Sequence, residues 1–311
     1  MKISNHNLTL NNFYRFFGTN FFDRIMIYLL SILAVLLARG IRVETYGGTI
    51  IAFGDATGRT TYRSLNRFLS RNIIPGGSSQ DFVCLLGNSF SEFPKLTDKL
   101  TTDFLVVIGD KDEHKQLAKY EADPRFIYPG DTYVEARYVD EEFGDEEQIC
   151  LWSVDSVNFT ETDAERLDTA FAETRETCHW NIVLSHLPLY SFGKHFNNTR
   201  IIEYRNKIIP ILKKYQIHLF LSSHDCSTQV VKIDELPNTV MLVIGAPITV
   251  DYHSIKNLIS ETIVGASLLW YDDETQGLVL RLNYCLESIV WEIVNIRNEK
   301  IELSGLIANE D

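Results

Sequence analysis

Two histidines in the chain follow short apolar runs that are typical of buried strands. His186 ends the run Trp180-Asn-Ile-Val-Leu-Ser-His186, and His224 ends the run His218-Leu-Phe-Leu-Ser-Ser-His224. The carboxyl ends of parallel strands meet at one edge of a sheet, so we expect both imidazoles at that edge. A single histidine in this setting is more often an ordinary core or loop residue. Two of them in the same setting indicate a metal site, because imidazole nitrogen is a common ligand of transition metals.

Three further apolar runs end in a glycine followed by a carboxylate or an amide. Residues 49–53, 81–86 and 104–108 are followed by Gly54-Asp55, Gly87-Asn88 and Gly109-Asp110, and Cys226 lies two residues after His224. Glycine lets the backbone turn sharply, so that the next side chain is presented at the sheet edge. Oxygen and imidazole donors that converge there suit a divalent or trivalent transition metal, and two such ions can clamp a phosphoryl group.

The elements that must position these donors alternate between strands and helices in the first half of the chain. Residues 62–69 have helical spacing, Thr162-x-x-Glu165 reads as a capping box for a helix to about residue 176, and residues 200–215 read as a helix interrupted by Pro210. Residues 132–140 alternate like an edge strand, and residues 141–147 form an acidic loop that we expect to be solvated. Strands with little helix between them follow, the last at residues 289–296. The pattern predicts one α/β domain that closes with antiparallel strands.

The local sequences around the donors resemble those of the calcineurin-like metallophosphoesterases, and among them most nearly the small purple (tartrate-resistant) acid phosphatases. Phe53-Gly-Asp55-Ala-Thr-Gly58 resembles the Gly-Asp-x-Gly motif of that family with one residue inserted, and the segment from Trp180 to Tyr190 is similar to its histidine-proline motif. The segment that ends in His224-Asp-Cys226 is similar to its final Gly-His-Asp-His motif. The resemblance covers about residues 49–250 and implies a two-sheet α/β/β/α sandwich with a phosphate-ester substrate.

The departures from the family pattern fall on the metal ligands. The resemblance places Asp55, Asn88, Ser91 and Cys226 at the first metal position, where the family has two aspartates, a tyrosine and a histidine. It places Asn88, Asp110, His186 and His224 at the second position. An amide in place of the bridging carboxylate removes a negative charge and a two-sided ligand, so a pair of cations is harder to hold. Asp110 with the two histidines still suits one zinc, iron or manganese ion. The sequence leaves open whether the site holds one metal ion, two or none.

Two residues are candidates for contact with phosphate. Lys111 stands where the family has a histidine beside the substrate; an ammonium attracts phosphate as a point charge but is a poor proton shuttle at acidic pH. His195, in Ser191-Phe-Gly-Lys-His195, lies where these phosphatases carry a second substrate-side histidine. An ordinary role for His195 in a polar loop is equally compatible with the sequence.

The chain of 311 residues carries 29 basic and 42 acidic residues and a formal charge of −13, which opposes docking on nucleic acid. Near its start, residues 25–38 are apolar, with Arg24 before them and Arg39 and Arg42 after them. The run is shorter than a full bilayer span, so a short signal anchor, a signal-peptide core and a buried helix are all compatible with it. We expect an N-terminal polar segment at 1–24, a transmembrane or signal-anchor segment at 25–42 and a phosphoesterase domain at 43–311.

The expected cellular location depends on the signal anchor predicted at residues 25–42. Three glycosylation acceptor patterns, at Asn7, Asn158 and Asn197, are compatible with a membrane-anchored or secretory protein whose body is lumenal or extracellular. The five cysteines are too few and too scattered for a disulfide framework or a paired-cysteine zinc site, and at least one of them must be unpaired within the chain.

Two functions are compatible with these features. The first is a metallophosphoesterase that hydrolyses phosphate monoesters with metal-activated water, impaired or reduced to a single metal. The second is a catalytically inactive pseudophosphatase that binds a protein partner from a membrane anchor. A serine hydrolase of another α/β type is disfavoured, because the sequence contains no Gly-x-Ser-x-Gly elbow.

Overall fold

The computed structural model of the chain describes residues 48–55, 59–73, 81–89, 100, 102–112, 118, 122–127, 133–139, 148–174, 178–245, 262–272 and 277–308. All of these residues belong to one compact unit, Tyr46–Asp311. The expected N-terminal segments 1–24 and 25–42, Ser91 and the acidic loop 141–147 lie outside the described residues. Among the helices that are described, none is long and apolar enough to cross a membrane.

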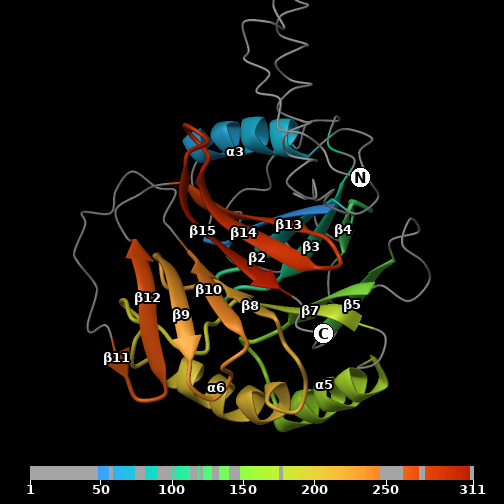
Figure 1. Ribbon diagram of the computed structural model, residues 1–311, viewed down its shortest axis with the longest axis vertical. Coiled ribbons are helices and arrows are strands. Elements are labelled where there is room, and N and C mark those ends of the chain that lie inside the picture. The colour runs from blue at the N-terminus through green and yellow to red at the C-terminus, as the bar shows by residue number, and fades with distance from the viewer. Residues whose placement is uncertain are drawn as a thin grey trace, which may run out of the picture. The chain divides into compact units, whose positions relative to one another are not determined.

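The described strands form two mixed sheets (Figure 1). The first has the order β15-β14-β13-β1-β2-β3-β4, in which β1 to β4 are parallel neighbours and β13 to β15 are antiparallel. Its strands are β1 (Gly48–Phe53), β2 (Phe82–Leu86), β3 (Asp103–Val107), β4 (Phe126–Ile127), β13 (Leu278–Tyr284), β14 (Ser288–Asn295) and β15 (Ile301–Ala308).

The second sheet has the order β11-β12-β9-β10-β8-β7-β6-β5. Within it β6, β7, β8 and β10 run parallel, and β5 pairs antiparallel at the edge, as the alternation of residues 132–140 predicts. Its strands are β5 (Tyr133–Val139), β6 (Gln148–Val154), β7 (Cys178–Ser185), β8 (Leu219–Ser222), β9 (Thr228–Ile233), β10 (Val240–Ile244), β11 (Thr262–Ile263) and β12 (Ala266–Asp272).

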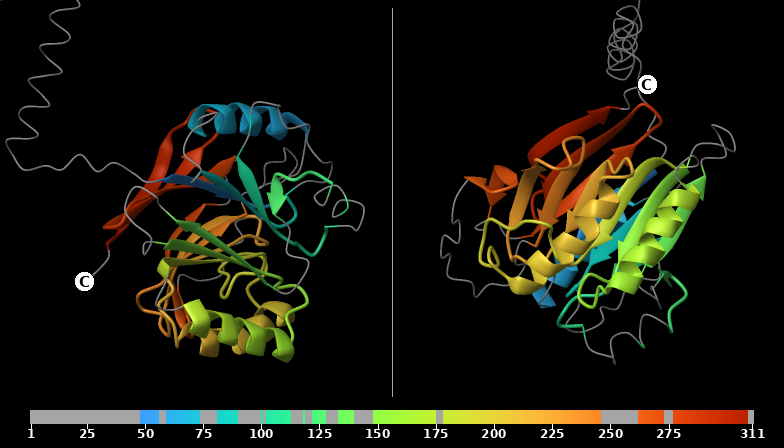
Figure 2. Two further views of the ribbon diagram at one scale, coloured as in Figure 1. Left: turned by 90° about the vertical axis from the view of Figure 1, so that its right-hand side faces the viewer. Right: turned by 90° about the horizontal axis from the view of Figure 1, so that it is seen from below.

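Side-chain alternation explains how the sheets stack. In β6, Ile149 and Leu151 join the core between the two sheets, whereas Cys150 and Trp152 join a second core under the helices. Successive side chains of a strand point to opposite faces, so one strand supplies both cores. Helix α3 (Arg59–Asn72) covers the outer face of the first sheet, and α5 (Glu161–Thr174) and α6 (Thr199–Leu212) cover the second (Figure 2). The expected α/β/β/α sandwich is therefore present.

The helix ends differ from the sequence predictions in two places. Asp163 and Thr160 form the reciprocal capping bonds of α5, with Asp163 N donating to Thr160 Oγ1 at 3.2 Å and Thr160 N donating to Asp163 Oδ2 at 2.8 Å, so the predicted box at Thr162 was wrong. Helix α6 continues past Pro210 to Leu212. A proline removes one N–H from the ladder, and so close to the C-terminus of a helix this loss does not end it at once.

The structure shows which cysteines are paired. Cys150 of β6 and Cys178 of β7 form a disulfide, whereas Cys84, Cys226 and Cys285 are free. The expectation of at least one unpaired cysteine is confirmed, and the scattered spacing did not reveal the one bridge. The bridge joins neighbouring strands because their pairing brings the two residues within 5.7 Å between Cα atoms.

Candidate metal centre

Five of the sequence-predicted donors meet where parallel strands of both sheets end. Asp55, Asn88 and Asp110 follow β1, β2 and β3, and His186 and His224 follow β7 and β8. The structure links all five through hydrogen-bond contacts of 2.7 to 3.2 Å. The packing of the two sheets therefore brings together residues up to 169 positions apart.

The backbone at these strand ends is strained in a consistent way. Asp55, Asn88, His224 and Cys226 all have positive φ angles, of 50°, 48°, 72° and 48°. Among the described non-glycine residues, Glu299 is the one other with a positive φ. Such conformations are unfavourable for residues with a Cβ atom and cluster at functional sites. These strand ends are therefore candidates for a functional site.

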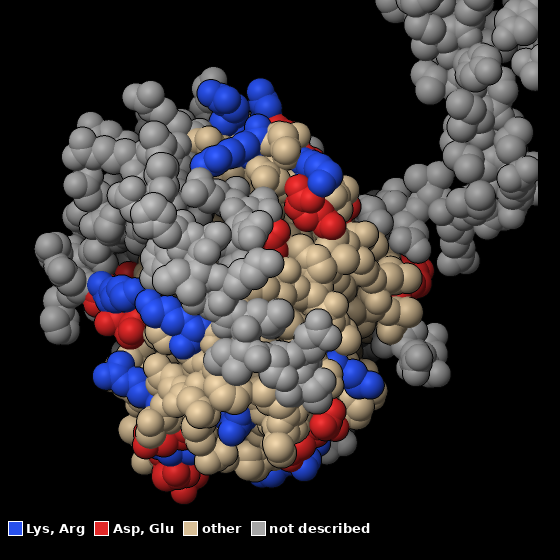
Figure 3. Space-filling view, turned by 90° about the vertical axis from the view of Figure 1, so that its left-hand side faces the viewer, with Lys and Arg blue, Asp and Glu red and all other residues tan. Residues whose placement is uncertain are grey.

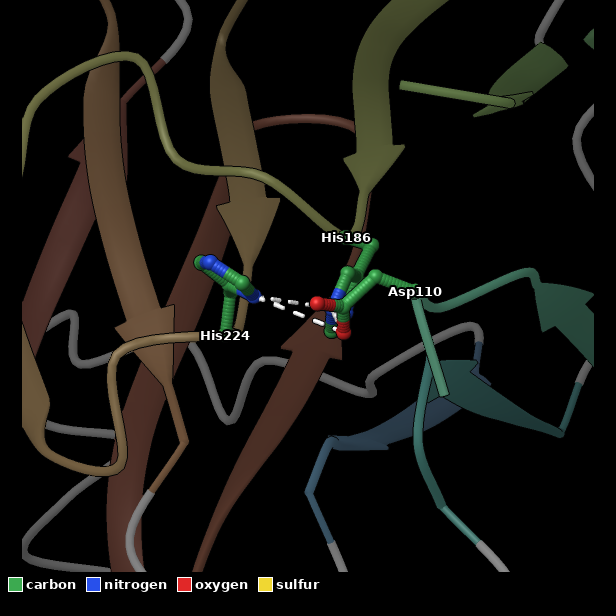
Figure 4. A group of neighbouring side chains, drawn as sticks. All are labelled: Asp110, His186 and His224. Atoms are coloured by element: carbon green, nitrogen blue, oxygen red, sulfur yellow. Dashed lines mark hydrogen bonds and ion pairs between the residues drawn. The ribbon is translucent and has the colours of Figure 1, made fainter. Parts of the chain in front are cut away.

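Asp110, His186 and His224 form the group that could hold a metal ion (Figure 4). His186 Nε2 lies 3.2 Å from Asp110 Oδ1 and 3.1 Å from His224 Nδ1, and His224 Nδ1 lies 3.7 Å from Asp110 Oδ1. Ligand atoms at 2.0–2.2 Å from a tetrahedral ion would be about 3.4 Å apart. The three separations fit one ion.

The hydrogen bonds of His186 set the orientation of its ring. Its Nδ1 contacts the carbonyl oxygen of Leu86 at 2.9 Å, so Nδ1 carries the proton and donates it. Nε2 then faces the Asp110 carboxylate at 3.2 Å, where it donates when it is protonated and where a metal ion would take the place of that proton. Burial lowers the pKa of His186, but the hydrogen bond to Asp110 and the charge of Asp55 raise it more, so that it lies above its usual value.

The charge of Asp110 is strongly favoured. Hydrogen bonds from His186 and His224 hold the pKa of its carboxyl far below the usual range, and this effect exceeds the cost of burial. The side chain of His186 is fully buried, whereas that of Asp110 is 21% exposed. An ionised carboxylate beside two buried imidazoles, open to solvent on one side, is a suitable setting for a transition metal.

Cys226 and Asp55 lie near this group but outside it. Asp55 accepts a hydrogen bond from the backbone nitrogen of His224 at 2.7 Å and one from Asn88 Nδ2 at 3.1 Å. Burial, followed by the charge of Asp55, raises the pKa of Cys226 to about 11, so the thiol is not readily ionised. Of the residues predicted for the first metal position, neither Asp55 nor Cys226 joins the group of Asp110, His186 and His224 in the described part of the chain.

The two candidates for phosphate contact lie beside the cluster. The ring of His195 is 4.4 Å from that of His224 between centroids, and burial together with the neighbouring imidazole lowers its pKa. Lys111 is exposed, and its backbone N–H donates to Asn88 Oδ1 at 2.9 Å. His195 is thus at the site, and Lys111 is anchored to it through its backbone.

Two carboxylates that sequence reasoning did not single out organise the loops. Asp225 is buried and accepts from Ser191 Oγ at 2.6 Å and from the backbone nitrogen of His195 at 2.8 Å. Asp112 accepts from the backbone nitrogens of Gly109 and Asn88 at 2.7 and 3.0 Å, and burial raises its pKa. Closeness in sequence to His224 and Asp110 was the one signal that pointed to them, because all of these partners except Gly109 lie 24 or more residues away.

Solved structures of several other proteins are similar to this one. It is similar to GAP50, described as the anchor in the inner membrane complex of Plasmodium, with 13% identity, a TM-score of 0.62 and coverage of 85% of this chain and 89% of that chain. It is similar to a purple acid phosphatase from yellow lupin seeds, with 13% identity, a TM-score of 0.61 and coverage of 85% and 55%. A dimetal phosphatase from Danio rerio has 10% identity, a TM-score of 0.55 and coverage of 86% and 100%.

The fold is a metallophosphoesterase-like α/β sandwich. No protein-family profile and no curated protein matches the sequence. At 10 to 13% identity the similarity shows the fold alone. Within this metallophosphoesterase-like fold, the partial cluster of Asp110, His186 and His224 is the feature that bears on chemistry.

Proposed function

We propose that the chain is a metallophosphoesterase reduced to a single metal ion, which hydrolyses phosphate monoesters at an impaired rate. The observation that carries this proposal is the convergence of Asp110, His186 and His224, with donor separations of 3.1 to 3.7 Å that suit one zinc, iron or manganese ion. The metallophosphoesterase-like fold and its similarity to a purple acid phosphatase support a phosphate-ester substrate.

The residues around the ion have separate roles in this proposal. A metal ion held by the three side chains would polarise a phosphoryl oxygen and lower the pKa of a bound water. The exposed ammonium of Lys111 attracts the phosphate as a point charge. The imidazole of His195, next to His224, contacts the ester and can transfer a proton. Asn88, Asp55 and Cys226 support the site, and the absence of a second ion accounts for the impaired rate.

A second candidate function is an inactive binding protein on a membrane anchor. The similarity to GAP50, which is described as an anchor, favours it, as does the failure of Asp55 and Cys226 to join the donor group. In this case the fold presents a surface to a protein partner. Acidic and basic side chains of the described residues are intermixed on the face shown in Figure 3, and the charge of −13 disfavours nucleic acid as the partner.

For both candidates we propose a membrane-anchored or secretory protein with a lumenal or extracellular body. The disulfide between Cys150 and Cys178 supports this location, because disulfides persist mainly in oxidising compartments. The anchor proposed at residues 25–42 would attach the body to the membrane.

The experiment is metal analysis and phosphomonoester turnover on the same full-length protein, purified in detergent and supplied with Zn, Mn or Fe. We expect about one ion per chain in the wild type and loss of both metal and turnover in His186→Ala and His224→Ala. His179→Gln is the matched control, since His179 bonds to the carbonyl of Leu286 away from the cluster. Metal without turnover would favour the binding protein, and neither metal nor turnover would overturn the single-metal enzyme.

A further inference from the structure

The side chain of Asn88 lies in the middle of the cluster, and its orientation is set by the next strand. The backbone N–H of Lys111 donates to Asn88 Oδ1 at 2.9 Å. An N–H requires an acceptor, so the amide oxygen must face Lys111 and the Nδ2 atom must face the opposite way. The close approach is possible because residue 109 is glycine: a Cβ there would lie 2.3 Å from Asn88 Oδ1.

The Nδ2 atom of Asn88 lies beside two carboxylates and an imidazole. It lies 3.1 Å from Asp55 Oδ1, 2.9 Å from Asp110 Oδ1 and 3.2 Å from His186 Nε2. Its two hydrogens carry partial positive charge, and the two carboxylates are their acceptors. The amide thus supplies positive charge where two carboxylates would otherwise face each other.

Asp55 completes the arrangement from the other side. Its Oδ1 accepts from Asn88, and its Oδ2 accepts from the backbone nitrogen of His224 at 2.7 Å. Asp55 is 7% exposed and both of its oxygens have partners within the protein. It therefore holds His224 in its left-handed conformation, with φ at 72°, and leaves the donor group to Asp110, His186 and His224.

We propose that the Asn88 amide and the Asp55 carboxylate form a hydrogen-bonded substitute for a second metal ion. The inference rests on the proposed function for the first ion and goes beyond it, because it makes Asn88 the residue that limits the number of ions and makes Asp55 a positioning residue. A carboxylate at position 88 would remove the amide donor that limits the number of ions. Three carboxylates would then converge without the amide donor between them, and a second cation would be needed to balance them.

The test compares the full-length wild type with Asn88→Asp and with the control Asn298→Asp. Asn298 is exposed, and its Oδ1 accepts from Lys300 N, a bond that an aspartate can also accept. Each variant adds the same charge. After dialysis against Zn or Mn, elemental mass spectrometry should find about one more ion per chain in Asn88→Asp than in the wild type, and no gain in Asn298→Asp. Chelation should lower the unfolding temperature of Asn88→Asp more than that of the control.

Equal metal content in Asn88→Asp and the wild type would overturn the inference. A wild type without metal, alongside an Asn88→Asp variant that gains an ion, would overturn the proposed function and leave the inference standing. If Asn88→Asp does not fold, calorimetric titration with Zn of the wild type and of His224→Ala decides. A loss of no more than one bound ion per chain in His224→Ala supports the inference, and a loss of two ions would overturn it.

Discussion

The carboxylate of Asp55 accepts a hydrogen bond of 2.7 Å from the backbone nitrogen of His224, 169 residues further along the chain. Both residues have positive φ angles, so the bond joins two strand ends in left-handed conformations. The bond joins the first sheet to the second at the candidate metal centre. The position of the His224 imidazole thus depends on a contact with the first sheet.

Gly87 lies where the first sheet approaches the ring of His186, so a substitution there tests how close that approach must be. Its φ is +84°, and a Cβ added there would lie 2.5 Å from His186 Nδ1. We expect Gly87→Ala to lower the free energy of unfolding by roughly 2–4 kcal/mol and to abolish metal binding, because the imidazole must move. Chemical denaturation and metal analysis would measure the two effects.

Gly277 provides the matched control for that substitution. Its φ is +78°, but an added Cβ would meet the flexible side chain of Ile296 at 2.9 Å. Gly277→Ala should destabilise the protein and leave its metal content unchanged. Intact metal binding in Gly87→Ala would show that His186 tolerates displacement, contrary to the geometry described above.

Asp225 should be required for the loop that carries His195. Its buried carboxylate accepts from Ser191 Oγ, Gln229 Nε2 and the backbone nitrogen of His195. Asp225→Ala leaves these buried donors unpaired, so we expect a loss of at least about 2 kcal/mol in the free energy of unfolding. Urea denaturation would test this against Asp234→Ala, an exposed site where the change should stay within about 0.5 kcal/mol. Similar midpoints for the two variants would contradict the assigned role.

The disulfide between Cys150 and Cys178 should contribute substantially to stability. It closes a loop with a sequence separation of 28. The chain-entropy relation gives about 3–4 kcal/mol for a loop of this length. We expect dithiothreitol to lower the midpoint of urea denaturation of the wild type and to leave that of the Cys150→Ala/Cys178→Ala variant unchanged. A wild type that is insensitive to reductant under unfolding conditions would argue against the bridge.

His218 should make stability depend on pH. Burial, together with the charge of His179, lowers the pKa of His218 to about 4 in the folded protein, against about 6.5 in the unfolded chain. Between these values the unfolded state binds the proton and the folded state does not. Stability should therefore fall as the pH decreases from 6.5 to 4, by up to about 3 kcal/mol.

The variant His218→Gln isolates that contribution. A glutamine can accept the hydrogen bond that Asn181 N donates to His218 Nδ1 at 3.0 Å, and it does not titrate. The free energy of unfolding, measured from pH 8 to pH 4, should fall less steeply in the variant than in the wild type. Parallel curves would rule out His218 as the source of the pH dependence.

Local signals in the sequence predicted much of the sandwich. Apolar runs such as residues 81–86 and 180–185 become buried strands because their composition suits burial on both faces. Strand β15 was not predicted, since its residues are mostly exposed or half-buried and show no core-facing run. The capping box of α5 was placed two residues too late, because Thr160 and Thr162 are equally good candidates until the backbone selects one.

The sequence by itself determined which donors stand at strand ends, because an apolar run followed by glycine is a local pattern. Only the tertiary structure decided which of those donors join the candidate metal group and which make other contacts. It gathered Asp110, His186 and His224 as one group, turned Asp55 toward the backbone of His224, and directed the Asn88 amide at two carboxylates. The physical reason is that these relations depend on distances between strands of two packed sheets, and the chain order does not contain such distances.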